Sequence, residues 1–157
     1  LARETGESGS LAVPLGREAL YLDQVEGTKL VRLFTAPGSR APLHATGVGK
    51  VFLAYLGVPE GLSLTPYTPH TLTRLPDLLR ELEAVRGRGY ALDNEEKELG
   101  VRCVAAPVFG ASGGVVAALS LSAPASRLSL EEAHRLAPRV VEAARRASLR
   151  LGYTGEV

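Results

Sequence analysis

Residues 89–128 read GYALDNEEKELGVRCVAAPVFGASGGVVAALSLSAPASRL, and this stretch decides the fold. Apolar runs at 101–109 and 115–123 predict two long strands, and the GASGG between them supplies the glycines that a tight turn with positive φ requires. A shorter strand is expected at 90–93, before the acidic residues of 94–98. The stretch therefore predicts a β-hairpin with a third strand beside it.

Side-chain alternation gathers small polar groups on one face of this hairpin. A hairpin symmetric about Ala111 and Ser112 would place Cys103 opposite Ser120, with Ser122 nearby. The small neighbours leave room for a polar molecule, although cysteine and serine also occur as ordinary residues of buried strands. The residues expected to share this face are Val101, Cys103, Ala105 and Pro107 on one strand and Val116, Ala118, Ser120 and Ser122 on the other.

Further strands are predicted near the N-terminus. Apolar alternation at 11–15, 19–25 and 29–34, interrupted by glycines, is typical of an antiparallel meander. The alternation does not decide which face of 19–25 is buried. With helices elsewhere in the chain, the sequence predicts an α/β (α+β) domain in which about six antiparallel strands are flanked by helices.

Two helices are expected in the middle of the chain. One begins near Thr46, after a loop containing prolines and a glycine. The other has Thr73 as its cap, Pro76 in its first turn, and Gly87 or Gly89 as its end. Its leucines recur at helical spacing, so one side should be buried.

A third helix is expected at the C-terminal end. Ser129 and Glu132 form a capping box, from which the helix runs toward Leu151 and ends at Gly152. Pro138 lies inside this span and should kink or split the helix, because proline lacks the N–H that the helical hydrogen bond needs.

Composition limits the classes of function. A chain of 157 residues with 45% hydrophobic and 22% charged residues fits one globular domain. Its net charge of +1 supplies no large positive field for nucleic acid. The single cysteine excludes an internal disulfide, and no apolar run has the length of a signal peptide or membrane helix. A cytoplasmic protein is the expected result, with no membrane contact.

The segment ATGVGK at 45–50 could hold an anion. Unpaired N–H groups and a partial positive charge mark a helix start, and glycines at 47 and 49 would let an anion such as a carboxylate approach these N–H groups closely. The segment is not a nucleotide-binding P-loop, because His44 and Val51 stand where that motif needs glycine and Ser or Thr. Alternatively, Gly47 and Gly49 only permit tight packing of the helix.

Asp93 and Cys103 are the other candidates for chemistry. Asp93 follows an apolar strand and could accept a hydrogen bond from a ligand hydroxyl, or could serve an ordinary turn. Cys103 would need a base to become a thiolate nucleophile, and no motif supplies one. The three histidines stand alone without the paired spacing of metal ligands, so no metal or cofactor is expected.

Three segments together resemble one protein family. LHATGVGKVFLAYL (43–56), RGYALDNEEKELGVRCVAAPVFG (88–110) and VVAALSLSAPASRLS (115–129) look like the C-terminal domain of the IclR family of bacterial transcriptional regulators. The resemblance implies a GAF-like fold that binds a small effector and controls an N-terminal winged helix-turn-helix domain. That DNA-binding domain is not in this chain, and the absence of methionine agrees with Leu1 not being a natural start.

The resemblance also implies domain limits, site residues and partners. Residues 1–9 would end a linker helix from the missing domain, and 10–157 would form the effector-binding domain. The effector would be a small organic acid or aromatic catabolite, and the chain a homodimer or tetramer that meets operator DNA only through the missing domain. The implied function is a sensor and not an enzyme; the alternatives are a GAF-like thiol enzyme using Cys103 and a purely structural oligomerisation domain. The implied effector-binding residues are Gly47, Val48, Asp93, Cys103, Ser120 and Ser122.

Overall fold

A six-stranded antiparallel sheet forms the centre of the molecule. The computed structural model describes residues 2–25 and 37–155. The sheet order is β3-β2-β1-β6-β5-β4, and every neighbouring pair is antiparallel. The predicted fold class is therefore confirmed. The elements in chain order are α1 (Ala2–Thr5), β1 (Ser8–Leu15), β2 (Glu18–Val25), β3 (Arg40–Pro42), α2 (Gly47–Leu56), α3 (Leu75–Arg88), β4 (Ala91–Asn94), β5 (Val101–Phe109), β6 (Val115–Pro124) and α4 (Leu130–Arg150).

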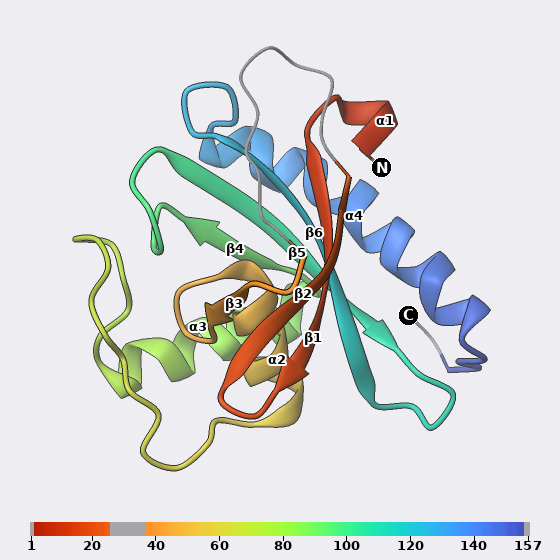
Figure 1. Cartoon of the computed structure of the whole chain (residues 1–157), viewed down its shortest axis with the longest axis horizontal. Coiled ribbons are helices and arrows are strands. Elements are labelled where there is room, and N and C mark those ends of the chain that lie inside the picture. Colours follow the sequence, from red (N-terminus) through yellow and green to blue (C-terminus); the bar gives the residue numbers. More distant parts are fainter. Residues whose placement is uncertain (1, 26–36, 156–157) are drawn as a thin grey trace.

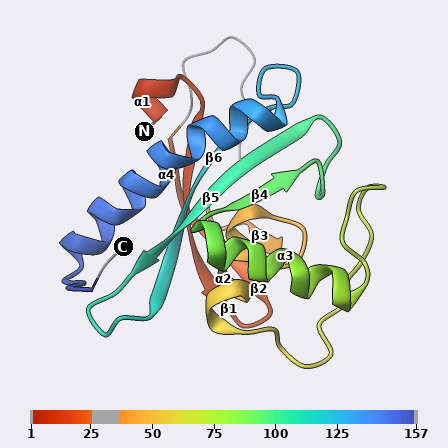
Figure 2. The ribbon, with the colours of Figure 1, turned by 180° about the vertical axis from the view of Figure 1, so that it is seen from behind.

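The helices cover the sheet from both sides. α2 and α3 lie together on one face, and α4 crosses the other face diagonally (Figures 1 and 2). The strand expected at 29–34 lies outside the described residues. The described sheet instead contains the short edge strand β3, which pairs with β2 and which the sequence pattern did not indicate.

Helix α2 begins where the sequence predicts. Thr46 is its N-cap in an extended conformation, and the Thr46 hydroxyl accepts the N–H of Gly49 at 3.1 Å. For α3 the expected cap is wrong. The helix starts one residue later, with Arg74 at the cap position and no side-chain hydrogen bond there, while Pro76 lies in the first turn as expected. It ends at Gly89, whose φ of 86° is the left-handed conformation typical of a helix stop.

Helix α4 is continuous across its proline. Ser129 accepts the N–H of Glu132 at 3.1 Å, as the capping box predicts. The prediction that Pro138 splits the helix is wrong, since residues 130–150 remain one helix and Pro138 is exposed on its outer side. Buried alanines, a valine and a serine on the inner side hold this helix against the sheet.

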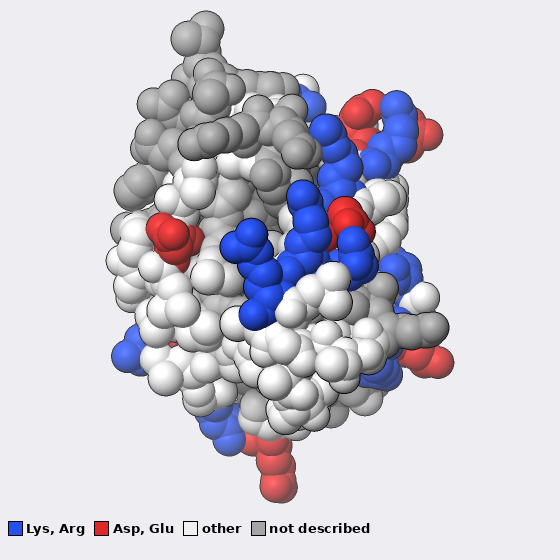
Figure 3. Space-filling model, turned by 90° about the vertical axis from the view of Figure 1, so that its right-hand side faces the viewer, with Lys and Arg blue, Asp and Glu red and all other residues white. Residues whose placement is uncertain are grey.

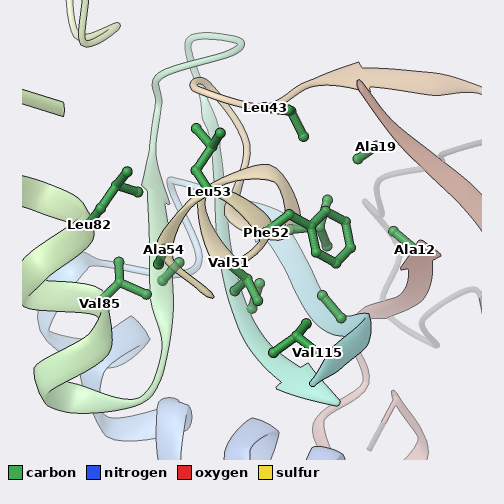
Figure 4. Packing of buried hydrophobic residues seen from close by; sticks show 14 of the residues in the cluster. Ala12, Ala19, Leu43, Val51, Phe52, Leu53, Ala54, Leu82, Val85 and Val115 are labelled. Atoms are coloured by element: carbon green, nitrogen blue, oxygen red, sulfur yellow. The ribbon is translucent and has the colours of Figure 1, made fainter. Parts of the chain in front are cut away.

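Two apolar cores lie on the two faces of the sheet. One packs α2 and α3 against the sheet; in Figure 4 Leu53 and Ala54 of α2 lie on the side of Leu82 and Val85 of α3, and Phe52 points toward Ala12 and Ala19 of the sheet. The other packs α4 against β5 and β6. Because β5 and β6 are covered on both faces, their residues are apolar at nearly every position and not in strict alternation.

The register of the β5–β6 hairpin differs from the symmetric expectation. Cys103 lies opposite Ser122, and Ser120 lies opposite Ala105. The expected Cys103–Ser120 pair is therefore wrong. Phe109 pairs with Val115, one residue further along β6 than a symmetric hairpin would place its partner, and the register shift between Val108 and Phe109 adds one more residue.

The same register shift corrects one face assignment. Val108 pairs with Ala117, and Phe109 pairs with Val115, which leaves Val116 as the extra residue of a β-bulge. Val115 is consequently buried in the α2 core, while Val116 is 42% exposed. Val116 does not share the face of Ser120 and Ser122.

The surface on the α4 side is basic but not uniformly so. Basic side chains gather in the middle of this face, with acidic side chains among them (Figure 3). Exposed ion pairs along α4 include Arg135–Glu132 and Arg145–Glu142, and such pairs contribute little to stability. Across the described ranges, none of the helices is long and apolar enough to span a membrane.

Candidate functional site

A row of polar residues crosses four strands on the α2 side of the sheet. Asp93 of β4 pairs with Cys103 of β5, Cys103 with Ser122 of β6, and Ser122 with Ser8 of β1. The Cys103 Sγ and Ser122 Oγ atoms are 3.0 Å apart. We call Asp93, Cys103, Ser122 and Ser8 the polar row. Directly paired residues project on the same side, so antiparallel pairing alone brings these groups together.

A second polar contact lies one row further along the sheet. Ser120 is buried, and its Oγ lies 2.5 Å from the Oγ of Ser10 on β1. Its partner on β5 is Ala105, whose methyl group leaves Ser120 without a polar neighbour on that strand. The structure thus brings Cys103 and Ser122 together and sets Ser120 beside them.

The start of α2 lies directly over this part of the sheet. A methyl group added at Gly47 would meet the Cβ of Ala105 at 3.1 Å and the Cβ of Cys103 at 3.9 Å, so Gly47 lies over β5 next to the polar row. The hydroxyl of Thr46 accepts the N–H of Gly49, and the carbonyl oxygen of Thr46 accepts the N–H of Lys50. Within the described part of the chain, the N–H groups of Gly47 and Val48 have no hydrogen-bond acceptor. These two donors are available to an anion.

The two glycines of α2 have different roles. A Cβ at Gly49 would lie 2.4 Å from the carbonyl oxygen of Leu43, a distance that no real contact allows. Gly49 is therefore required for tight packing of the helix, which is the alternative role that the sequence analysis gave to the two glycines. Gly47 has more space, and the side chain of Val48 is buried in the α2 core, so Val48 can offer only its backbone to a ligand.

Asp93 is buried, and the charge of Lys50 acts on it. Its side chain is held by the N–H of Glu96, which donates to Oδ1 at 2.8 Å. Burial raises the pKa of Asp93 to about 7, and the negative charge of Glu96 also raises it, while the hydrogen bond from Glu96 and the charge of Lys50 lower it. The Asp93 carboxyl therefore changes its charge near neutral pH.

A buried ion pair joins the start of α2 to the turn after β4. Lys50 is completely buried, and its Nζ donates to both carboxylate oxygens of Glu96 at 2.9 and 3.0 Å. Glu81 of α3 lies 3.6 Å from the same Nζ and also pairs with Arg88. Glu96 in turn accepts the N–H of Asn94 at 3.0 Å. The charges of this group are thus matched to one another.

The turn that carries Glu96 is fixed from several directions. Glu95 has φ of 58°, a conformation that non-glycine residues rarely adopt. The hydroxyl of Thr68 donates to the Glu95 carbonyl at 2.7 Å, and the hydroxyl of Thr71 donates to the Glu96 carbonyl at 2.5 Å. Such strain persists only where surrounding contacts determine the conformation. The acidic residues after β4 therefore include groups that hold this turn in place.

Tyr21 of β2 belongs to the same cluster, although sequence analysis did not identify it. Burial raises the pKa of the Tyr21 hydroxyl, and the proximity of Cys103 and Asp93 raises it further. A register shift between Leu11 and Ala12 turns Ala19 and Tyr21 toward the α2 core and leaves Asp23 exposed. Simple alternation within 19–25 placed Tyr21 and Asp23 together and gave no signal of this shift.

The environment of Cys103 does not favour a nucleophile. Burial raises the pKa of the Cys103 thiol, and the negative charge of Asp93 raises it further, so the thiol stays protonated at neutral pH. In the part of the chain that the structure describes, no group of three or more His, Cys, Asp or Glu residues could hold a metal ion. The arrangement can bind a polar molecule through hydrogen bonds and the two free N–H groups of α2.

Comparison with known proteins places this chain in a family. The family model described as "Bacterial transcriptional regulator IclR C-terminal" matches residues 1–149. The chain is 40% identical over 159 residues to the HTH-type transcriptional regulator XynR of Escherichia coli, an alignment that covers 98% of this chain and 63% of XynR. The chain thus spans somewhat less than two thirds of that relative.

Solved structures agree with this placement. The Thermotoga maritima IclR structure superimposes with a TM-score of 0.87 at 38% identity, covering 96% of this chain and 63% of that one. The inducer-binding domain of PobR from Acinetobacter, solved as a double mutant with 3-hydroxybenzoic acid, gives a TM-score of 0.80 at 29% identity, covering 95% and 89%. With its fold and its sequence both matched over nearly the whole length, the chain belongs to the IclR family of bacterial transcriptional regulators and corresponds to their C-terminal domain.

Proposed function

We propose that this domain senses a small carboxylate-bearing molecule, which binds between the start of α2 and the polar row. The observation that carries the proposal is the position of the free N–H groups of Gly47 and Val48 beside the pair formed by Asp93 and Cys103. Two N–H groups at a helix start suit a carboxylate. The hydroxyl and thiol groups of the polar row suit the polar atoms at its other end.

The proposed effect of binding is regulatory. In a longer protein of this family, the bound effector would change how an attached winged helix-turn-helix domain meets its operator, with the domain acting as a dimer or tetramer in the cytoplasm. The relative XynR is an HTH-type transcriptional regulator, and the neighbour PobR holds a hydroxylated aromatic acid in its inducer-binding domain. Regulation by population shift requires the effector to bind one arrangement of the domain more tightly than the other.

A thermal-shift screen tests the proposal. Small organic acids and hydroxylated aromatic acids are added to the chain, because a ligand that binds only the folded state raises Tm. An acid that raises Tm for the native chain should lose its effect in Ser122→Ala, which removes a hydroxyl of the polar row. Ser126→Ala, which changes an exposed serine of the loop after β6, is the matched control and should respond as the native chain does.

Two results would contradict the proposal. If no acid changes Tm, a purely structural role in oligomerisation becomes the better account of the domain. If an acid binds equally well in Ser122→Ala and in the control, the binding site lies elsewhere in the molecule.

A further inference from the structure

The charges around Asp93 are already balanced before any ligand binds. Lys50 is the buried cation of this cluster, and both carboxylate oxygens of Glu96 accept hydrogen bonds from it. Glu81 also approaches Lys50, while its other oxygen pairs with Arg88. Lys50 therefore already faces two carboxylates besides Asp93. An ionised Asp93 adds a further negative charge in a buried place, where it is 3% exposed.

Among residues 2–25 and 37–155, the other groups that act on Asp93 bring no positive charge. Asp93 faces the thiol of Cys103 on β5 and the hydroxyl of Tyr21 on β2. Both groups stay neutral because burial raises their pKa. From the turn after β4 Asp93 receives backbone N–H groups of Glu96 and Lys97. The Lys97 side chain lies elsewhere, with its Nζ 4.7 Å from the centre of the Tyr67 ring.

A carboxylate bound at α2 would bring a second negative charge close to Asp93. A Cβ added at Gly47 would lie 3.9 Å from the Cβ of Cys103, and Cys103 pairs directly with Asp93, so a molecule of a few atoms bound at Gly47 would reach Asp93. The helix start supplies only about half a unit of positive charge, which the bound carboxylate itself would use. Two carboxylates at this separation in a buried site strongly favour protonation of one.

We propose that the effector carboxylate binds together with one proton from solvent, which Asp93 holds in the complex. The proposal rests on the proposed function of the same site. The net charge of the site then stays constant on binding, since one negative charge and one proton enter together. The protonated carboxyl keeps an oxygen for the N–H of Glu96 and gains an O–H that it donates to the bound molecule.

The consequence is an affinity that depends on pH. Below neutral pH the free domain already carries the proton, and affinity should be constant. Above neutral pH the proton must be taken up, so affinity should fall about tenfold for each pH unit. Ionised ligands that are not linked to a proton would show no such dependence.

Calorimetric titration of this chain tests the proposal, with glyoxylate, pyruvate and 3-hydroxybenzoate as probes. Each probe that binds is titrated at pH 6 and pH 8.5 in phosphate and in Tris, whose different heats of ionisation reveal the number of protons exchanged. We expect about one proton taken up for each ligand at pH 8.5 and clearly fewer at pH 6, with affinity roughly 30-fold weaker at the higher pH. In parallel, carbon-13 NMR follows the ionisation of Asp93 in the free chain.

Two variants decide whether Asp93 is the group that takes up the proton. Asp93→Asn is neutral at every pH, so it should bind without proton uptake and with an affinity that no longer falls at pH 8.5. His44→Gln removes the histidine nearest to α2 in sequence while keeping a donor for the carbonyl of Thr65, which lies 2.8 Å from His44 Nε2. This control should take up protons as the native chain does.

The outcomes distinguish this proposal from the proposed function. Binding at both pH values without proton uptake, or an Asp93 carboxyl that stays ionised down to pH 5 in the free chain, overturns the proton coupling alone. Proton uptake that persists in Asp93→Asn also overturns it. If none of the three probes binds at either pH, the proposed carboxylate site fails, and the proton coupling fails with it.

Discussion

Lys50 Nζ lies 2.9 and 3.0 Å from the two carboxylate oxygens of Glu96, and no part of the lysine reaches solvent. This pair connects the helix whose start forms one end of the candidate site to the turn that holds Asp93 at the other end. Removal of one partner would leave the other charge buried and unpaired, which is far more costly than the loss of the pair itself.

Lys50→Met should therefore destabilise the domain strongly, by about 3–5 kcal/mol in the free energy of unfolding. The double variant Lys50→Met with Glu96→Leu removes both charges and should recover a substantial part of that loss. Urea denaturation of the two variants measures the difference. A single variant that loses less than about 1 kcal/mol would show that water or another group replaces the missing charge.

Asp93→Asn should stabilise the domain at alkaline pH. The pKa of Asp93 is raised from 3.8 to about 7, so between these values the folded state holds a proton that the unfolded state has released. Stability therefore falls as pH rises from about 4 to 7 and then stays low, by up to about 4 kcal/mol from this group. Asparagine avoids this loss. Urea denaturation at pH 4 and pH 8.5 should show the variant gaining stability over the native chain only at the higher pH; an equal difference at both would contradict the raised pKa.

Gly49→Ala should destabilise the domain much more than Gly47→Ala does. At Gly49 a methyl group would overlap the backbone of Leu43, so we expect a loss of roughly 2–4 kcal/mol in the free energy of unfolding. At Gly47 the methyl group would come no closer than 3.1 Å to its nearest neighbour, the Cβ of Ala105, so the loss should be below about 1 kcal/mol, and helix propensity offsets part of it.

Binding provides the second measurement on the same two variants. Because Gly47 lies where the carboxylate would approach, Gly47→Ala should weaken binding of an acid identified by thermal shift by roughly tenfold or more. Unchanged binding in a folded Gly47→Ala domain would place the anion away from the start of α2.

Cys103 should react slowly with thiol reagents. Its pKa is raised by burial and by Asp93, and the thiolate is the reactive form. At pH 8 we expect the folded chain to react with Ellman's reagent at least about 100-fold more slowly than the chain in urea. Since the chain has one cysteine, the colour change reports this site alone. Reaction at the rate of the unfolded chain would show that the thiol is accessible and ionised.

Local signals in the sequence were sufficient for most of the secondary structure. Thr46 and Ser129 act as caps because their hydroxyls bond to N–H groups only three residues away, and Gly89 ends α3 because its backbone accepts a positive φ. The long strands of the hairpin were also predictable from their apolar runs. The family could be recognised from contiguous motifs, and the family model confirms it.

The candidate site was only partly predictable. The sequence identified Asp93, Cys103 and Ser122, which the structure places in one row, but it paired Cys103 with the wrong serine. The position of the turn moves the partners of β5 by one residue and the β-bulge moves them by one more, and no local pattern reveals either shift. A second irregularity, in the β1–β2 ladder, turns Tyr21 inward, and this residue was missed for the same reason.

The sequence by itself thus determined the elements, the family and the residue types of the site, because these depend on interactions between residues close together in the chain. Only the tertiary structure decided the strand registers, the place of Tyr21 and the burial of Lys50 against Glu96. Lys50 and Glu96 are 46 positions apart, and each would be read from the sequence as a solvated charge. Their pairing depends on how α2 packs against the sheet, where loss of water makes an unpaired charge too costly to remain.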